Sequence, residues 1–183
     1  MVMSTETKQW TLAELHRLPD DGNRYELVRG VLFVTPTPSD PHETIGARLH
    51  SLLGLYVAKY NLGYIYRPRA VMMFDGSQVE PDLMVRLPHP DEDNPAWETA
   101  PTPSLVVEIS SRTTWRRDHN EKRALYLDAR VPEYWIVDGA ERTVAIVKPE
   151  RADAGVRDSM CWHPNGASEP LCFDVGEVFG MKR

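Results

Sequence analysis

The segment that most constrains the fold is LVVEIS, at residues 105–110. Three apolar residues precede Glu108 and one follows it, which is typical of a strand covered on both faces. Such strands lie at the centre of a sheet with helices packed on it, so the segment predicts an α/β domain. Glu108 is the exception, because an ionised carboxylate in an apolar interior neutralises, pairs or binds a cation.

Hydrophobic periodicity predicts a regular order of helices and strands around this segment. Seven apolar residues recur with helical spacing from Ile45 to Tyr60, and Asn61 to Gly63 end that helix. Asp40 is its predicted N-cap, with Pro41 in the first turn. From about residue 42 the order is helix, three strands, helix and strand, which predicts a mixed central sheet flanked by helices.

The other segments are predicted to extend this core within one domain, residues 1–183. Thr11 and Glu14 have capping-box spacing, which predicts a short helix. Arg29-Gly30 and Asp75-Gly76 predict the turns of two hairpins. The predicted parts are an N-terminal helix and hairpin (10–35), the core (about 42–138) and a C-terminal hairpin and tail (139–183).

Composition excludes several classes of protein. Hydrophobic residues make up 42% and charged residues 26% of the chain, an ordinary globular mixture. No apolar stretch approaches the roughly 20 residues of a membrane helix. MVMSTETKQW lacks the features of a secretory signal, so we expect a cytoplasmic protein. The formal charge of −6 argues against a nucleic-acid coat protein but not against an enzyme with positive charge on one face.

The two cysteines, Cys161 and Cys172, do not belong to a CxxC pair. A zinc ribbon is therefore excluded, and a reducing compartment disfavours a disulfide between them. We expect two small, buried or half-buried hydrophobic side chains.

Asp82 is the predicted companion of Glu108. It interrupts the apolar residues of VEPDLMV in the same way, and Pro81 marks a strand irregularity beside it. Two acids that point the same way from adjacent strands repel each other, and a divalent cation with oxygen ligands, Mg²⁺ or Mn²⁺, relieves the repulsion. The alternative is a structural ion pair with an arginine or a lysine, for example Arg67, Arg69 or an arginine of the following helix.

A second helix, predicted over about residues 114–129, adds a lysine to these acids. One of its faces carries Trp115, Asp118, Lys122, Leu125, Tyr126 and Ala129. Lys122 therefore faces inward, and two interpretations of it stay open. It forms an i,i+4 pair with Asp118 at the solvent margin, or it places an ammonium beside the carboxylates to stabilise developing negative charge.

Glu26 and His42 are weaker candidates for the same pocket. Glu26 fits an exposed position of an edge hairpin equally well. His42 falls on the inward side of the first turn of its helix, but a histidine there is more often a surface or capping residue than a ligand.

Six motifs together resemble a known family. In chain order they are YEL-x-x-G, PS-x-x-H, PDL, VVEISS-x-T, D-x-x-x-K-x-x-x-Y and VPEYWIVD, between about Trp10 and Val147. Their ordered combination resembles the Uma-type "putative restriction endonucleases" of the PD-(D/E)XK nuclease superfamily. The resemblance implies a restriction-endonuclease-like core, whose helix, three strands, helix and strand match the order predicted from periodicity.

The resemblance also implies a chemistry. Asp82 and Glu108 would hold Mg²⁺ (or Mn²⁺), with the carbonyl of Ile109 as a further ligand, for hydrolysis of a DNA phosphodiester. The sequence departs from the superfamily motif at Ser110, where a lysine is expected, and Lys122 resembles a relocated substitute. The further pocket candidates are Glu26, His42, Ser110 and Asp118.

Arginines near the predicted cleft are candidates for phosphate contacts, although a solvated helix start explains any one of them as well. They are Arg67, Arg69, Arg112, Arg116 and Arg117. The predicted function is a metal-dependent DNA endonuclease, with a homodimer suggested by analogy alone. The alternatives are an inactive nuclease-fold module that binds nucleic acid or another partner, a small-phosphoester metallohydrolase, and a metal-free protein in which Asp82 and Glu108 form salt bridges.

Overall fold

The computed structural model describes residues 8–91, 93 and 95–180. Its central layer is a six-stranded mixed sheet in the order β10-β9-β8-β7-β6-β3. Strands β7 and β8 are parallel, and the other neighbours are antiparallel. The strands are β3 (Tyr64–Tyr66), β6 (Leu83–Arg86), β7 (Leu105–Ser110), β8 (Tyr134–Asp138), β9 (Thr143–Val147) and β10 (Ala154–Val156).

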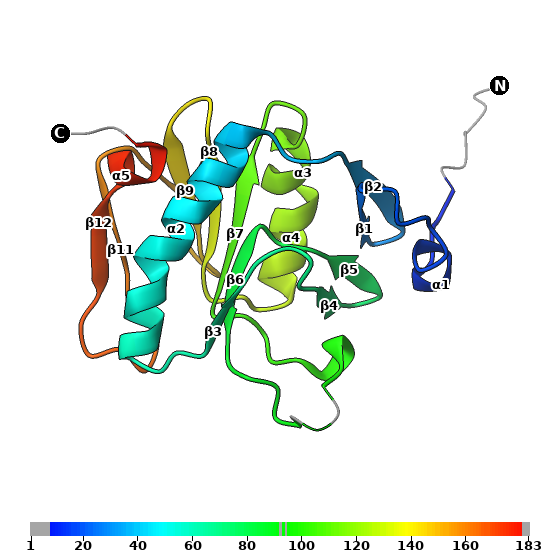
Figure 1. The fold of residues 1–183 in the computed structure, drawn as a ribbon, viewed down its shortest axis with the longest axis horizontal. Coiled ribbons are helices and arrows are strands. Elements are labelled where there is room, and N and C mark those ends of the chain that lie inside the picture. Colours follow the sequence, from blue (N-terminus) through cyan, green and yellow to red (C-terminus); the bar gives the residue numbers. More distant parts are fainter. Residues whose placement is uncertain (1–7, 92, 94, 181–183) are drawn as a thin grey trace.

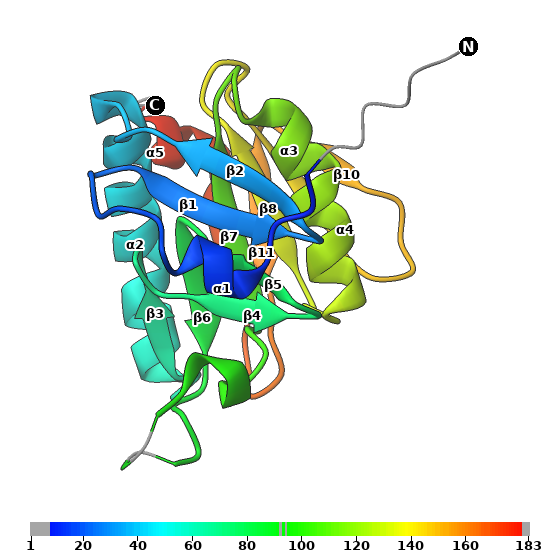
Figure 2. The ribbon, with the colours of Figure 1, turned by 90° about the vertical axis from the view of Figure 1, so that its right-hand side faces the viewer.

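Two smaller sheets complete the β structure. A four-stranded antiparallel sheet has the order β2-β1-β5-β4, and Figure 2 shows it from its outer side. A two-stranded hairpin, β11-β12, lies at the opposite side of the molecule (Figure 1). These strands are β1 (Arg24–Val28), β2 (Val31–Thr35), β4 (Met72–Phe74), β5 (Ser77–Val79), β11 (Ser159–Trp162) and β12 (Leu171–Asp174).

Helices cover both faces of the six-stranded sheet, as predicted. On one face the long helix α2 packs with β11-β12 and α5 around an apolar core, and on the other α4 packs with residues of the four-stranded sheet (Figure 1). The helices are α1 (Leu12–Leu15), α2 (Asp40–Lys59), the 3₁₀ turn η1 (Trp97–Thr99), α3 (Trp115–His119), α4 (Glu121–Asp128) and α5 (Val175–Phe179).

Strand β7 occupies the centre of this arrangement, and all six of its residues are buried. Its side chains alternate between the two cores. Val107 and Ile109 pack in the core under α2, whereas Val106 packs in the core under α4. Glu108 has the parity of Val106, so its carboxylate points toward α4.

The helices agree with the sequence prediction at α1 but differ from it at the start of α2 and in the continuity of the second predicted helix. The capping box of Thr11 and Glu14 is formed at α1. Helix α2 has Ser39 as its N-cap, so the predicted cap, Asp40, is instead the first helical residue. The second predicted helix is interrupted at Asn120, whose backbone leaves the helical region, and it becomes α3 and α4. Trp115 is consequently 48% exposed rather than inward-facing.

The strands around the Asp75-Gly76 turn are shorter than the sequence suggested. The turn joins β4 to β5 in the four-stranded sheet, whereas β3 and β6 belong to the six-stranded sheet. The chain crosses from β5 to β6 through residues 80–82, because Pro81 cannot donate to a strand ladder. Asp82 therefore stands where the two sheets separate.

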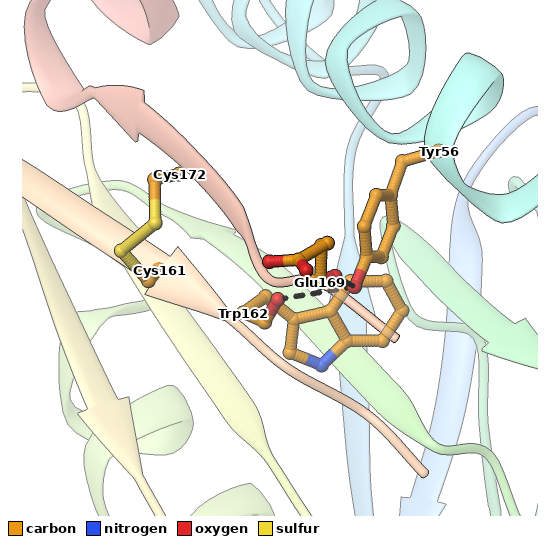
Figure 3. The surroundings of a disulfide bond; sticks show 5 residues. All are labelled: Tyr56, Cys161, Trp162, Glu169 and Cys172. Carbon is orange, nitrogen blue, oxygen red and sulfur yellow. Dashed lines mark hydrogen bonds between the residues drawn. A yellow bond between two sulfur atoms is a disulfide. The ribbon is translucent and has the colours of Figure 1, made fainter. Parts of the chain in front are cut away.

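The expectation for the cysteines was wrong. Cys161 and Cys172 face each other across β11 and β12 and form a disulfide, and both residues are exposed (Figure 3). Alternation along the hairpin explains their exposure, because the neighbouring Trp162 and Phe173 point into the core. The Tyr56 hydroxyl ties this hairpin to α2 by donating to the carbonyl of Glu169 at 2.7 Å.

None of the helices in the described part of the chain is both long and apolar enough to cross a membrane.

Candidate active site

A cleft of about 640 Å³ lies at the end of β7, where the N-terminus of α2 meets the start of β1. Segments from several distant parts of the chain line it, including residues 35–39, which begin at the last residue of β2, and residues 109–114, which begin at the end of β7. Charged and imidazole side chains at its wall are Arg24, His42, Arg69, Glu80, Arg112 and Arg117.

Asp82 and Glu108 occupy opposed positions on adjacent strands at this end of the sheet. Strand β6 pairs with β7 through Leu83 opposite Val107, and continuing that antiparallel register places Asp82 opposite Glu108. Both residues are buried, with 4% and 1% exposure. The predicted pairing of two acids on neighbouring strands is therefore present in the fold.

Asp82 is surrounded by hydrogen-bond donors. Its Oδ1 accepts from Arg24 Nη1 at 2.8 Å, and its Oδ2 lies 2.7 Å from the amide nitrogen of Ile109 and 3.1 Å from His42 Nε2. Burial opposes ionisation of Asp82, but the contacts with His42 and Arg24 outweigh it and lower the pKa of this carboxyl. His42 in turn has a raised pKa, because its contact with Asp82 outweighs burial.

Glu108 is held from α4. Lys122 Nζ and the Tyr126 hydroxyl both donate to Glu108 Oε1, at 2.7 and 2.6 Å. Burial nevertheless raises the pKa of Glu108 to about 7, with Asp82 and Glu26 adding to the rise against the effect of Lys122. Burial also raises the pKa of Tyr126 well above its usual value, so its hydroxyl stays a donor.

Glu26 completes the surroundings of Lys122 and is entirely buried, not exposed on an edge. Its Oε1 accepts from Lys122 Nζ at 2.7 Å and from the amide of Glu80 at 2.8 Å. Its Oε2 has no hydrogen-bond partner of good geometry, although Arg117 Nη1 lies 3.3 Å away. Arg117 and Glu26 therefore form a buried ion pair without a well-oriented hydrogen bond at this oxygen.

Lys122 lies between Glu26 and Glu108 and has no exposed surface. The structure thus places it beside the carboxylates instead of at the solvent margin with Asp118. Asp118 pairs with its neighbour Arg117, at 3.2 Å between Nε and Oδ1. Burial would lower the pKa of Lys122, but Glu108 and Glu26 outweigh it and raise that pKa.

Acids and bases in this cluster are linked to one another. Within the described chain, four carboxylates and three permanent cations are joined, and His42 is a further partner of Asp82. The four carboxylates and three cations are Glu26, Asp82, Glu108, Asp118, Arg24, Arg117 and Lys122. Burial is the main cause of the raised pKa of Glu108, and the neighbouring carboxylates of Asp82 and Glu26 add to it.

Ser110 stands at the wall of the cleft, two residues after Glu108. It is 4% exposed, and its Oγ has no hydrogen-bond partner among the described residues. The lysine position of the superfamily motif thus holds a buried and unsatisfied hydroxyl, a feature that is uncommon away from functional sites.

The predicted phosphate-binding arginines divide into two groups. Arg69, Arg112 and Arg117 line the cleft, but Arg117 is committed to Glu26 and Asp118. Arg67 pairs with Glu43, and neither Arg67 nor Arg116 is among the cleft-lining residues. The suggested ion-pair role of Arg67 or Arg69 with Asp82 was wrong, because Arg69 pairs with Asp20.

Arg24 and Glu80 were not anticipated. Arg24 pairs with Asp82 and also donates to the carbonyl of Glu80 at 3.0 Å, and both side chains line the cleft. The sequence held one usable signal. Arg24 precedes Glu26 by two residues in RYELV, and this spacing puts both side chains on one face of the strand.

A hard divalent cation fits the donors at this site, although three His, Cys, Asp or Glu side chains do not converge anywhere in residues 8–91, 93 and 95–180. Asp82 Oδ1 accepts one hydrogen bond and keeps a free lone pair. Both contacts of Glu108 fall on Oε1, and Ile109 lines the cleft. Carboxylate and carbonyl oxygens are the ligands that Mg²⁺ and Mn²⁺ prefer.

Comparison with known proteins agrees with this architecture. The family model Uma2, described as "Putative restriction endonuclease", matches residues 12–172. A crystal structure at 1.96 Å of "a putative nuclease belonging to DUF820 from Anabaena variabilis ATCC 29413" superimposes with a TM-score of 0.80 and 21% sequence identity, covering 93% of this chain and 98% of that one. The curated proteins contain no match. The structural neighbour shows the shared fold, a mixed α/β arrangement with a central mixed sheet.

Proposed function

The chain belongs to the Uma2 family, and from this premise we propose that it is a metal-dependent endonuclease that hydrolyses DNA phosphodiester bonds in the cleft at the end of β7. The observation that carries the proposal is the pair of buried acids, Asp82 and Glu108, which stand opposite each other at the end of two adjacent strands. Three groups in contact with Asp82, which are Arg24, His42 and the amide of Ile109, belong to residues that line the cleft.

Asp82, Glu108 and the carbonyl of Ile109 would hold Mg²⁺ or Mn²⁺. The bound ion supplies Lewis acidity, which lowers the pKa of water and stabilises charge on the phosphoryl group. Lys122 fixes the orientation of Glu108 through its 2.7 Å contact, and Tyr126 holds the same oxygen. The amide of Ile109 and His42 orient Asp82 in the same manner.

The cleft supports a polyanionic substrate. Arg69 and Arg112 are exposed at its wall and lie on different segments, so they are placed to contact two phosphates of a backbone. The acidic net charge of the chain is compatible with this function because four arginines, Arg24, Arg69, Arg112 and Arg117, line one cleft.

Two observations favour rival functions. Asp82, Glu108 and Glu26 already pair with Arg24 and Lys122, as in a metal-free module that binds a partner without hydrolysis. A cleft of about 640 Å³ also has the volume of a small-molecule site, which favours a small-phosphoester hydrolase.

Metal binding and substrate range separate these functions. Calorimetric titration with Mn²⁺ and Mg²⁺ is combined with cleavage of supercoiled DNA and of a chromogenic phosphodiester. We expect wild type to bind one Mn²⁺ and nick the DNA, and D82N to lose both properties. The matched control is D153N, since Asp153 is a surface acid paired with Arg123 away from the cleft.

Three results would redirect the assignment. A wild-type protein without Mn²⁺ binding excludes both hydrolases. Metal binding without cleavage of either substrate favours the inactive module. Turnover of the chromogenic ester alone favours the small-molecule enzyme.

A further inference from the structure

Asp82 is neutralised in this structure by a side chain that also faces the cleft. Arg24 Nη1 lies 2.8 Å from Asp82 Oδ1 and donates to the carbonyl of Glu80 at 3.0 Å. Arg24 is also one of the residues that line the cleft, and its side chain is 16% exposed. Arg24 therefore occupies the carboxylate that a divalent cation would need.

Arg24 is the least firmly held of the three permanent cations in the cluster. Lys122 is fully buried and contacts two carboxylates, and Arg117, at 8% exposure, contacts two carboxylates and the hydroxyl of Thr35. Arg24 contacts one carboxylate and one carbonyl. It can leave its acid without unpairing a second buried carboxylate, and it remains in the cleft when it does.

We propose that Arg24 exchanges with the divalent cation at Asp82 and that the released guanidinium binds a phosphate of the substrate. This inference rests on the proposed function, because it assumes a cation at Asp82. A divalent ion beside Asp82 repels the guanidinium, and an incoming phosphate attracts it. Guanidinium groups match phosphate oxygens with two parallel hydrogen bonds, so the cleft offers Arg24 a second partner of equal quality.

The exchange couples two binding events. If the cation frees Arg24 for phosphate, then cation binding raises the affinity for the phosphate backbone, and the backbone raises the affinity for the cation by the same factor. Without the cation and the DNA backbone, Arg24 neutralises Asp82 as an internal counterion. The contact between Arg24 and Asp82 thus explains why Asp82 is salt-bridged although the cleft suits an anionic ligand.

Mn²⁺ affinity in the absence of DNA tests the competition directly. Calorimetric titration compares wild type with R24M, which has no charge at Asp82, and R24K, which keeps the charge. R69M is the matched control, since Arg69 lines the same cleft but pairs with Asp20. We expect R24M to bind Mn²⁺ about tenfold more tightly than wild type, and R24K and R69M to stay within about twofold of it.

Fluorescence anisotropy of a labelled duplex with phosphorothioate linkages tests the second half. In wild type and R69M, Mn²⁺ should raise duplex affinity by a similar factor, even where R69M binds more weakly throughout. In R24M that factor should be about tenfold smaller. Circular dichroism of R24M and R24K establishes that each variant is folded, and R24Q, which also removes the charge, replaces R24M where the methionine variant is not folded.

The outcomes separate this inference from the function on which it rests. Mn²⁺ binding that is about tenfold tighter in R24M than in wild type, together with a coupling factor that is smaller by the same amount, supports the exchange. Equal Mn²⁺ affinities in R24M, R69M and wild type overturn the exchange and leave the metal-dependent nuclease intact. No Mn²⁺ binding by any variant overturns the proposed function itself. Tighter Mn²⁺ binding by R24M with an unchanged coupling factor overturns the transfer of Arg24 to phosphate.

Discussion

Replacing Lys122 with methionine removes the ammonium that contacts both Glu26 and Glu108. The ammonium makes a 2.7 Å contact with each carboxylate, and all three groups are buried. Methionine has a similar volume and no charge, so the variant leaves two carboxylates close together without their shared partner. Breaking a buried ion pair from one side costs about 3–5 kcal/mol, and we expect K122M to lose about 4 kcal/mol at pH 8.

The loss should depend on pH in a defined direction. Burial raises the pKa of Glu108 to about 7, above its ordinary value of 4.5. A carboxyl with a raised pKa binds more protons when folded, so its contribution to stability is full at low pH and falls as the pH rises through about 7. Removing Lys122 raises the pKa of Glu108 further. At pH 5.5 Glu108 is then protonated, and we expect K122M to lose about 1 kcal/mol less than at pH 8.

Urea unfolding at both pH values measures these losses, and for a chain of this length the larger one corresponds to a melting temperature lower by roughly 8–16 °C. K148M is the control, since Lys148 also makes a 2.7 Å contact with a buried acid, Glu133, but is 35% exposed. It should lose no more than about 1 kcal/mol at either pH. A K122M protein as stable as K148M at pH 8 would refute the role of Lys122 as the shared counterion.

Three further predictions concern Glu108, the disulfide and the Tyr56 hydroxyl. Mn²⁺ affinity should rise about tenfold between pH 6 and pH 8, because the ion competes with the proton that Glu108 holds up to about pH 7, and E108Q should show no such rise in calorimetry. Replacing Cys161 and Cys172 with serine should cost about 3 kcal/mol of stability from the 11-residue separation, and dithiothreitol should then leave the melting temperature unchanged. Y56F should lose about 1 kcal/mol in urea unfolding, since the Tyr56 hydroxyl donates to Glu169 at 2.7 Å.

Alternation along strands carried most of the information about the candidate site. Successive side chains of a strand point to opposite faces of the sheet, so Asp82 was predicted on the face opposite Leu83. Glu108, which pairs with Asp82 in register, was predicted on the same face as Asp82. Helical spacing also predicted that Lys122 faces inward. The break at Asn120 did not change this, because Lys122 and the buried residues on its face of the helix, Leu125 and Tyr126, all follow the break.

Pairing between distant segments could not be read from these patterns. Arg24 and Asp82 are 58 residues apart, with Arg24 in β1 of the four-stranded sheet and Asp82 just before β6 of the six-stranded sheet, so neither periodicity nor a local motif links them. The sequence instead suggested Arg67 and Arg69, which are nearer to Asp82 in the chain. Those arginines pair with the surface acids Glu43 and Asp20.

Ser110 is the cleft residue for which measurements of stability and of DNA affinity distinguish a structural role from a binding role. Its buried Oγ has no hydrogen-bond partner in the described residues, so the hydroxyl contributes a desolvation cost and no compensating bond. S110A should therefore be as stable as wild type or more stable by about 1 kcal/mol. S111A is the control, because the Ser111 hydroxyl contacts Thr113 and Thr114 and its loss weakens the turn before α3.

The same variant should weaken the substrate complex. An unpaired hydroxyl at the wall of a cleft can donate a hydrogen bond to a bound ligand, and a phosphate oxygen is a suitable acceptor. We expect S110A to reduce duplex affinity in anisotropy by about fivefold while its melting temperature does not fall. A loss of stability with unchanged duplex affinity would show instead that Ser110 fills space in the core, and the vacated lysine position would then have no part in binding.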